Sequence, residues 1–342
     1  MRSCLALRSQ TAWSAVCAEA EILNSRHPDS KQIRSFFEKG FSAFRVTTTG
    51  GNDHGLITGY YEPLLHGSRS PVAPFLTPLY SVPDDLITVD LAEDYPQLKG
   101  LTLRGKIDGQ RLVAYPSRAD LAGNAAPRGK ELVWVDDPVA AFFLQVQGSG
   151  RIELFEGDGA RTVIRLAYAD QNGRPYRSIG RWLVDQGELT LDQVSMQSIE
   201  DWARSHPDRV DSLLNANPSY VFFKEESIDD PSLGPKGALG VPLTPGRSIA
   251  IDPRVLPLGA PVFLESPDPL NGATAARLTL AQDTGGAIRA RADQPVRADL
   301  FCGFGAEAAL RAGTMKENGR MWVLLPKGMP PTIDRSFGGG SS

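Results

Sequence analysis

The stretch Leu278-Thr-Leu-Ala-Gln-Asp283-Thr-Gly-Gly-Ala287 carries an apolar, strand-like run into a carboxylate and two glycines. Glycine at this point lets the backbone turn sharply and approach another group closely. Two interpretations of Asp283 are open from this stretch alone. Its side chain either accepts hydrogen bonds from the N–H groups of its own turn, or it serves a site together with other carboxylates.

Two more aspartates lie near predicted strand ends, beside proline or glycine. Asp252 ends the run that begins at Ser248 and is followed by Pro253, and Asp299 lies in Pro295-Val-Arg-Ala-Asp-Leu-Phe301. The strand ends of a small barrel could bring the three carboxylates together. Burial or a neighbouring like charge raises the pKa of a carboxyl group, and a protonated carboxyl can cleave a glycosidic bond as a general acid. The pattern therefore favours acid catalysis on a glycan.

Several other function classes fit the sequence poorly. Asp-Thr-Gly also occurs in aspartic proteases, but these need two such carboxylates, and the chain has one Asp-Thr-Gly and no Asp-Ser-Gly. The 3 cysteines and 4 histidines form neither Cys-x-x-Cys nor His-Glu-x-x-His. We therefore expect no metal ion and no organic cofactor.

Composition indicates a turn-rich, mainly β protein with a sizeable core. The chain has 342 residues, of which 41% are hydrophobic, and it contains 34 glycines and 26 prolines, which favour short strands and many turns. Its formal charge of −4 argues against a nucleic-acid partner. The sequence contains no apolar run of about 18 residues, the length that would predict a membrane span.

The first 45 residues are predicted to form two helices, each with an apolar stripe. In one continuous helix Cys4 and Cys17 would lie roughly 20 Å apart, too far for a disulfide, so a bridge would require a broken helix. We therefore expect two small buried thiols. No apolar run precedes Cys4, so neither a signal peptide nor a lipid-attachment site is visible.

A short apolar run in the middle of the chain is predicted to be a strand. Phe142-Phe-Leu-Gln-Val-Gln147 is bounded by Gly148-Ser149-Gly150. The alternation of a strand would place Gln145 and Gln147 on one face, where their amides could bind sugar hydroxyl groups. Residues 152–155 and 162–167 are predicted to form a hairpin.

Eight motifs follow one another in a single order between about Trp13 and Leu325. They are Thr58-Gly-Tyr-Tyr-Glu-Pro63, Gln145-Val-Gln-Gly-Ser-Gly150, Tyr168-Ala-Asp-Gln-Asn-Gly-Arg-Pro-Tyr-Arg-Ser-Ile-Gly180, Ser195-Met-Gln197, Asn217-Pro-Ser-Tyr-Val-Phe-Phe223, Asp252 to Gly259, Gln282-Asp-Thr-Gly-Gly-Ala-Ile288 and Gly319-Arg-Met-Trp-Val-Leu324. The set resembles the membrane-bound lytic murein transglycosylase A family. Eight motifs in order are far more specific than any one of them.

This resemblance implies a mainly β fold made of two barrels with a few flanking helices. Residues 1–63 plus 230–330 would form a discontinuous double-psi β-barrel catalytic domain that includes the N-terminal helices. Residues 64–229 would form an inserted, smaller β-barrel domain that provides the other wall of a glycan groove. Residues 331–342 are expected to be a disordered tail.

The resemblance also implies an activity. The family cleaves the β-1,4 bond between N-acetylmuramic acid and N-acetylglucosamine in peptidoglycan during cell-wall turnover, and it forms 1,6-anhydromuramoyl ends. Asp299 matches its catalytic acid, with Asp283 and, more weakly, Asp252 in support. Asp293 competes with Asp299 for that role, because an apparent insertion lengthens the interval after Asp283. We prefer Asp299, since its downstream sequence through Gly303 keeps the family pattern.

Binding, location and rival functions complete the expectations. The partner would be peptidoglycan glycan strands, bound by a monomer, and complexes with other cell-wall enzymes are a further expectation. The protein would lie in the periplasm at the outer membrane, and Met1 would then be a truncated or misassigned start. The rivals are an inverting glycan hydrolase on the same barrel and a non-catalytic peptidoglycan-binding protein. The expected substrate-binding residues are Tyr60, Tyr61, Gln145, Gln147, Gly148, Ser149, Gly150 and Gln197.

Overall fold

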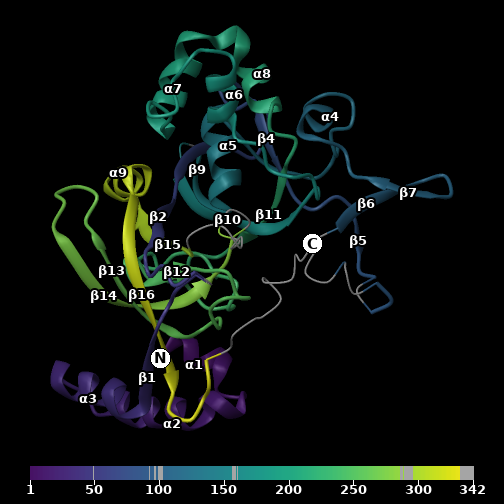
Figure 1. The fold of residues 1–342 in the computed structure, drawn as a ribbon. Coiled ribbons are helices and arrows are strands. Elements are labelled where there is room, and N and C mark those ends of the chain that lie inside the picture. The colour runs from purple at the N-terminus through teal and green to yellow at the C-terminus, as the bar shows by residue number, and fades with distance from the viewer. Residues whose placement is uncertain are drawn as a thin grey trace, which may run out of the picture. The chain divides into compact units, whose positions relative to one another are not determined.

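The computed structural model describes residues 1–48, 50–91, 93–95, 98, 103–155, 159, 161–285, 288 and 296–331. The chain divides into two compact units (Figure 1). Unit 1 joins Met1–Tyr61 to Asp230–Ser342, and unit 2 comprises Glu62–Asp229. None of the described helices is long and apolar enough to cross a membrane.

Unit 1 is built around a closed barrel. Its sheet has the strand order β1-β16-β13-β14-β12-β15-β2, and β16 also pairs with β2, so six strands close on themselves. This architecture confirms the mainly β fold class. The strands are β1 (Phe41–Arg45), β2 (Gly55–Glu62), β12 (Ser248–Ala250), β13 (Pro261–Pro267), β14 (Thr274–Asp283), β15 (Arg297–Phe304) and β16 (Lys316–Pro326).

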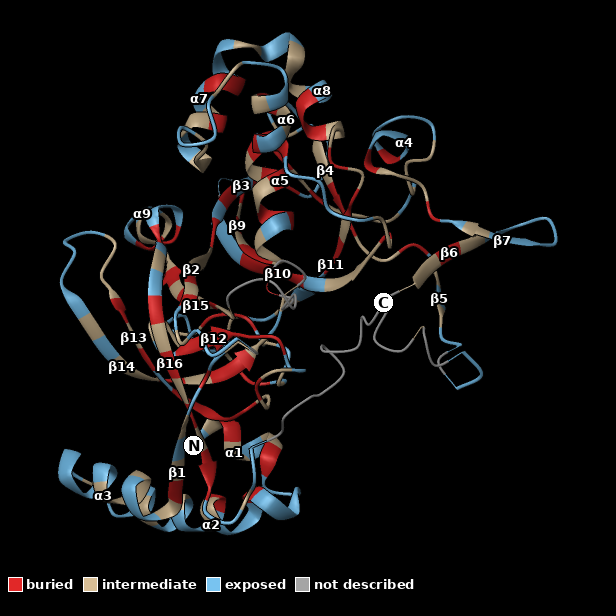
Figure 2. Cartoon of the chain, viewed as in Figure 1, coloured by how far each residue is buried: buried red, intermediate tan, exposed pale blue. Residues whose placement is uncertain are grey.

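The main apolar cluster of unit 1 joins the barrel strands to the N-terminal helices, and Figure 2 shows where buried residues lie along the ribbon. Strand alternation turns every second side chain inward, and most of these inward side chains are apolar, although the buried Thr279 pairs with Val262 on this face. Burial of each large aliphatic side chain contributes about 1.5–3 kcal/mol. The cluster includes Ile57, Ile249, Ile251, Val262, Leu264, Ala281, Ala298, Leu300, Met321 and Val323.

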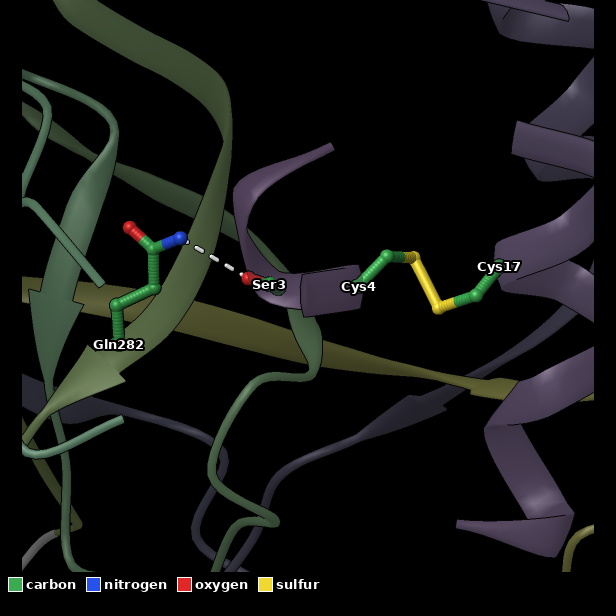
Figure 3. The surroundings of a disulfide bond; sticks show 4 residues. All are labelled: Ser3, Cys4, Cys17 and Gln282. Carbon is green, nitrogen blue, oxygen red and sulfur yellow. Dashed lines mark hydrogen bonds between the residues drawn. A yellow bond between two sulfur atoms is a disulfide. The ribbon is translucent and has the colours of Figure 1, made fainter. Parts of the chain in front are cut away.

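The N-terminal segment forms three helices rather than the predicted two. They are α1 (Arg2–Leu7), α2 (Thr11–Ser25) and α3 (Ser30–Gly40). Because the chain turns between α1 and α2, the Cα atoms of Cys4 and Cys17 lie 5.3 Å apart and the two cysteines form a disulfide (Figure 3). The prediction of two free thiols is therefore wrong, and the helix break is the physical reason.

The apolar stripe of α3 also continues beyond the helix. The helix begins with a capping box between Asp29 and Gln32 and ends at Gly40. Phe41, the next apolar residue after the helix, opens β1 and pairs with Pro326 of β16. The apolar stripe does not show where the helix ends, and none of the residues of α3 itself is fully buried.

Unit 2 contains a second, six-stranded sheet with the order β11-β10-β9-β3-β8-β4. Ser81, which follows β4, forms an isolated bridge with Phe223 of β11, so the two edges of this sheet meet. The predicted hairpin is confirmed by the antiparallel pairing of β9 with β10. The strands are β3 (Leu64–Ser68), β4 (Thr77–Tyr80), β8 (Glu131–Val135), β9 (Ser149–Phe155), β10 (Arg161–Gln171) and β11 (Val221–Glu226), with β5 (Ile87–Val89), β6 (Leu103–Asp108) and β7 (Arg111–Ala114) in a separate sheet.

The predicted strand at 142–147 is wrong, because this segment belongs to helix α5 (Pro138–Gln147). Asp137 caps the helix by accepting from the N–H groups of Val139 and Ala140, and Pro138 occupies its first turn. A buried helix can be apolar on nearly every side, so a short stretch of it is easily mistaken for a buried strand. The other described helices are α4 (Arg118–Ala122), α6 (Ile179–Asp185), α7 (Met196–Ser205), α8 (Val210–Asn215), the 3₁₀ turn Pro207–Arg209 and, in unit 1, α9 (Ala306–Thr314).

The cap of α5 leads to a stability prediction. Asp137→Ala leaves two N–H groups without their acceptor and should lower the free energy of unfolding by about 1 kcal/mol, whereas Asp137→Ser should keep most of it. Urea unfolding followed by circular dichroism measures the difference. Asp229→Ala, at an exposed position, is the control and should change stability by less than about 0.5 kcal/mol. Equal losses in both alanine variants would contradict the capping role.

Candidate active site

Asp283 and Asp299 lie on the two strands that flank β12. Ala250 of β12 pairs with Asp283 of β14 in parallel and with Asp299 of β15 in antiparallel orientation. Residues paired across neighbouring strands present their side chains on the same face of the sheet. The two carboxylates therefore share one face, on the strands to either side of Ala250 and about 10 Å apart at their Cα atoms.

Asp299 combines burial with an unused hydrogen-bond acceptor. Its Oδ1 atom is buried and has no hydrogen-bond partner among the residues that the structure describes. Burial raises the pKa of Asp299 to about 6; the Asp283 charge adds to this rise, while a Thr58 side-chain hydrogen bond and the Arg297 charge oppose it. A carboxyl group with this pKa can hold a proton near neutral pH.

Asp283 is held through both carboxylate oxygens. The hydroxyl of Tyr60 donates to Oδ2 at 2.8 Å, and the backbone N–H of Ala238 donates to Oδ1 at 2.9 Å. Burial raises the pKa of Asp283, and these hydrogen bonds oppose the rise. Since both oxygens are engaged, the contacts suit a fixed negative neighbour better than a group that exchanges protons with substrate.

Tyr60 provides the side-chain donor at this site, and it stays protonated. Burial and the nearby Asp283 charge raise the pKa of its phenol well above the usual value, so the hydroxyl keeps its proton for Asp283. Its ring packs against Phe301 with centroids 5.3 Å apart. Tyr61 is partly exposed, and alternation on β2 points it to the opposite face.

Asp252 follows β12 and organises the loop after it. Only 4% exposed, it accepts from the backbone N–H of Arg254 at 3.0 Å. The Arg254 guanidinium donates two hydrogen bonds to the same carboxylate, from Nε to Oδ1 at 2.9 Å and from Nη2 to Oδ2 at 2.5 Å. These contacts favour a role in positioning the loop over a role in proton transfer.

Gln145 lies in unit 2, 5% exposed, beside a buried arginine. Its side-chain oxygen accepts from Nη2 of Arg118 at 2.5 Å, and the same nitrogen donates to the carbonyl of Ser219. On a helix, residues two apart project about 200° apart, so Gln145 and Gln147 do not share a face. The prediction that both amides face the sugar assumed a strand. Because the segment is the helix α5, that argument for the two glutamines no longer applies.

The Gly148-Ser149-Gly150 motif forms the junction between α5 and β9. Gly148 has φ 82°, in the left-handed region that favours glycine, and its N–H donates to the carbonyl of Leu144. Ser149 is 7% exposed, and a Cβ atom at Gly150 would collide with Leu144. The two glycines therefore serve the turn and the packing of the helix. Gln197, in contrast, is exposed in the first turn of α7.

Two contributors to the site were missed from the sequence. Thr58 lies two residues before Tyr60 on β2, so strand alternation gives a signal that both side chains face the same way. Ala238 contributes only a backbone N–H, which no side-chain pattern can indicate. Asp293, the rival of Asp299, lies outside the described residues. Within the described ranges, no group of three or more His, Cys, Asp or Glu side chains is placed to hold a metal ion.

Comparison with known proteins is consistent with this geometry. Residues 56–224 match the family model "MltA specific insert domain", and residues 247–325 match the "3D domain". Membrane-bound lytic murein transglycosylase A of Escherichia coli K12 is 33% identical over 304 residues, which are 86% of this chain and 72% of the relative.

Solved structures give the same result. A crystal structure of MltA from Neisseria gonorrhoeae matches with a TM-score of 0.80 at 37% identity, covering 96% of this chain and 87% of that one. E. coli MltA with bound chitohexaose matches with a TM-score of 0.69 at 30% identity, covering 94% and 87%. Sequence and fold thus agree over nearly the whole length, and the chain belongs to the membrane-bound lytic murein transglycosylase A family.

Proposed function

We propose that this chain is a peptidoglycan lytic transglycosylase and that Asp299 is its general acid. The observation that carries the proposal is the state of the Asp299 carboxyl group, which is buried, has a pKa of about 6 and keeps one oxygen without a partner among the described residues. General acids need a pKa near the working pH, and environments that provide it cluster at active sites. Membership of the family supports the reaction class.

One carboxyl group suffices for the whole reaction. Protonated Asp299 donates its proton to the bridging oxygen between the two sugars as the C1–O bond breaks through an oxocarbenium-like state. The Asp299 carboxylate then accepts the proton of the muramoyl 6-hydroxyl group, whose oxygen bonds to C1. The products are a free 4-hydroxyl end and a 1,6-anhydromuramoyl end, Asp299 is again protonated, and no water is consumed.

Asp283 supports this chemistry through its charge. Its carboxylate lies across Ala250 from Asp299 and adds to the rise in the pKa of that group. The hydrogen bonds from Tyr60 and Ala238 fix where this charge lies. Asp252 has an indirect role, because its ion pair with Arg254 positions the loop that follows β12.

Glycan binding is proposed for polar groups that the sequence predicted as substrate contacts. E. coli MltA has been solved with bound chitohexaose, which supports a site for a linear amino-sugar chain here. Tyr61 and Gln197 are accessible candidates for direct contacts. Gln147 and Gly148 lie at the end of α5, whereas the buried Gln145, Ser149 and Gly150 would act by shaping that junction.

We further propose that the protein works in the periplasm, associated with the outer membrane. Its relatives are named as membrane-bound, and a structural disulfide is typical of exported proteins. Fractionation of the native cells should recover the protein, with Cys4 and Cys17 oxidised, from the periplasmic or membrane fraction. Recovery of the native product from the cytosol with both thiols reduced would contradict this location.

The identity of the acid is tested by Asp299→Asn. Asparagine is nearly isosteric but cannot supply the acid proton, so release of anhydro-muropeptides from purified sacculi should fall by at least about 10² to 10⁴-fold. Asp293→Asn is the control and should retain most activity. Mass spectrometry of the products also separates reaction types, because anhydro ends mark transglycosylation and reducing ends mark hydrolysis. An active Asp299→Asn enzyme with an inactive Asp293→Asn enzyme would transfer the role to Asp293.

The raised pKa of Asp299 predicts the pH dependence. Because the protonated form is the active one, kcat/KM should fall as pH rises through about 6. Asp283→Asn removes a charge that adds to this pKa, so it should move the fall to lower pH and lower the rate at neutral pH. Assays on soluble glycan strands between pH 4 and 8 at constant ionic strength measure both profiles. An unchanged profile in Asp283→Asn would exclude the charge effect.

A further inference from the structure

Strand β14 carries one extra residue beside the site. Ile249 of β12 pairs with Ala281, but the next residue, Ala250, pairs with Asp283, so Gln282 is skipped in the ladder between the two strands. Ile249 and Ala281 both face the barrel core. Strict alternation from Ala281 would therefore turn Asp283 inward, and the bulge at Gln282 instead turns it to the face that Asp299 shares.

The backbone of this bulge is held by the segment 237–239. The carbonyl of Gln282 accepts from the N–H of Leu239 at 3.0 Å. The adjoining N–H of Ala238 binds the Asp283 side chain. A Cβ atom at Gly237 would lie 2.5 Å from the carbonyl oxygen of Gln282, so only glycine permits this approach.

The side chain of Gln282 is fixed at both ends of its amide. With 1% exposure, it accepts from the hydroxyl of Ser248 at 2.6 Å. It also donates to the hydroxyl of Ser3 at 2.9 Å, the bond drawn in Figure 3. A buried amide that loses such partners is costly, so the two serines define where the bulge lies. Ser248 belongs to β12, whereas Ser3 belongs to the N-terminal helix α1.

Helix α1 has too few residues to be stable by itself, so tertiary contacts must hold it. The disulfide from Cys4 to Cys17 fastens it to α2 (Figure 3). Leu7, 2% exposed, packs into the barrel core, and Arg2 donates to the hydroxyl of Thr244 at 3.1 Å. Ser3 is thereby presented to Gln282 from a covalently anchored element.

From this continuous set of contacts we propose that Gln282 is a positioning residue for Asp283, held in place by the disulfide-anchored helix α1. The proposal rests on the proposed function, because Asp283 acts there through its charge on Asp299. Gln282 is buried, its amide is bonded to Ser248 and Ser3, and it therefore acts through Asp283. It keeps the bulge in the one arrangement that places the Asp283 carboxylate beside Tyr60 and on the same face as Asp299.

The test compares two losses of buried hydrogen bonds on one strand. Gln282→Ala should move the fall of kcat/KM to lower pH by roughly half a unit or more, in the direction of Asp283→Asn, and should lower kcat more than it changes KM. Thr279→Val, also on β14, removes a buried hydrogen bond to the carbonyl of Val262 and leaves Gln282 untouched. It should reduce the melting temperature without moving the pH profile.

Two variants that leave Gln282 in place test the role of helix α1 and its disulfide. Ser3→Ala and Cys17→Ser should each produce a smaller shift in the same direction. Each should add less than its full effect when combined with Gln282→Ala, because they act through that residue. If Gln282→Ala does not fold, the shift in Ser3→Ala decides the question.

The outcomes separate this proposal from the proposed function. A Gln282→Ala enzyme that loses thermal stability but keeps the wild-type pH profile, while Asp299→Asn is inactive, would overturn the positioning role alone. An Asp299→Asn enzyme that remains active would overturn the function itself. A shift in Ser3→Ala without one in Cys17→Ser would remove the disulfide from the proposal.

Discussion

The pairing of β12 with both β14 and β15 is the constraint on which the site depends. It sets Asp283 and Asp299 on either side of Ala250, on one face of the barrel wall. The same strand turns Ile249 and Ile251 into the core, so the residues that stabilise the barrel also fix the register of the carboxylates. Across this one intervening strand the charge of Asp283 still raises the pKa of Asp299.

Burial of the Asp299 carboxyl group lowers the stability of the folded chain at neutral pH. A carboxyl group with a pKa of about 6 in the folded chain, against 3.8 in an unfolded one, binds its proton more tightly when folded. Its contribution to stability is therefore most favourable below pH 3.8, declines as pH rises to about 6 and stays low above that, a difference of about 3 kcal/mol. The closed core offsets this penalty, and the resulting acid is what the reaction uses.

Both parts of unit 1, which are far apart in the sequence, contribute residues to this site. Thr58 and Tyr60 come from the N-terminal part and contact Asp299 and Asp283 of the C-terminal part. Ser3 makes the same connection behind the sheet, at Gln282. A chain that inserts a whole unit after β2 keeps its active site only because strand pairing between β2, β15 and β16 rejoins the two parts.

The sequence alone determined the family, the mainly β class and the strands that end near Asp283, because ordered motifs and period-two alternation are local patterns that survive in any context. Tertiary structure decided the rest. Helix α5 replaced a predicted strand, since a buried helix is apolar on nearly all sides and its cap, Asp137, lies outside the apolar run. The Cys4–Cys17 disulfide depends on a break between two helices. The bulge at Gln282 depends on hydrogen-bond partners from α1, from β12 and from the segment 237–239. Such features arise where distant segments meet, so no local pattern in the sequence specifies them.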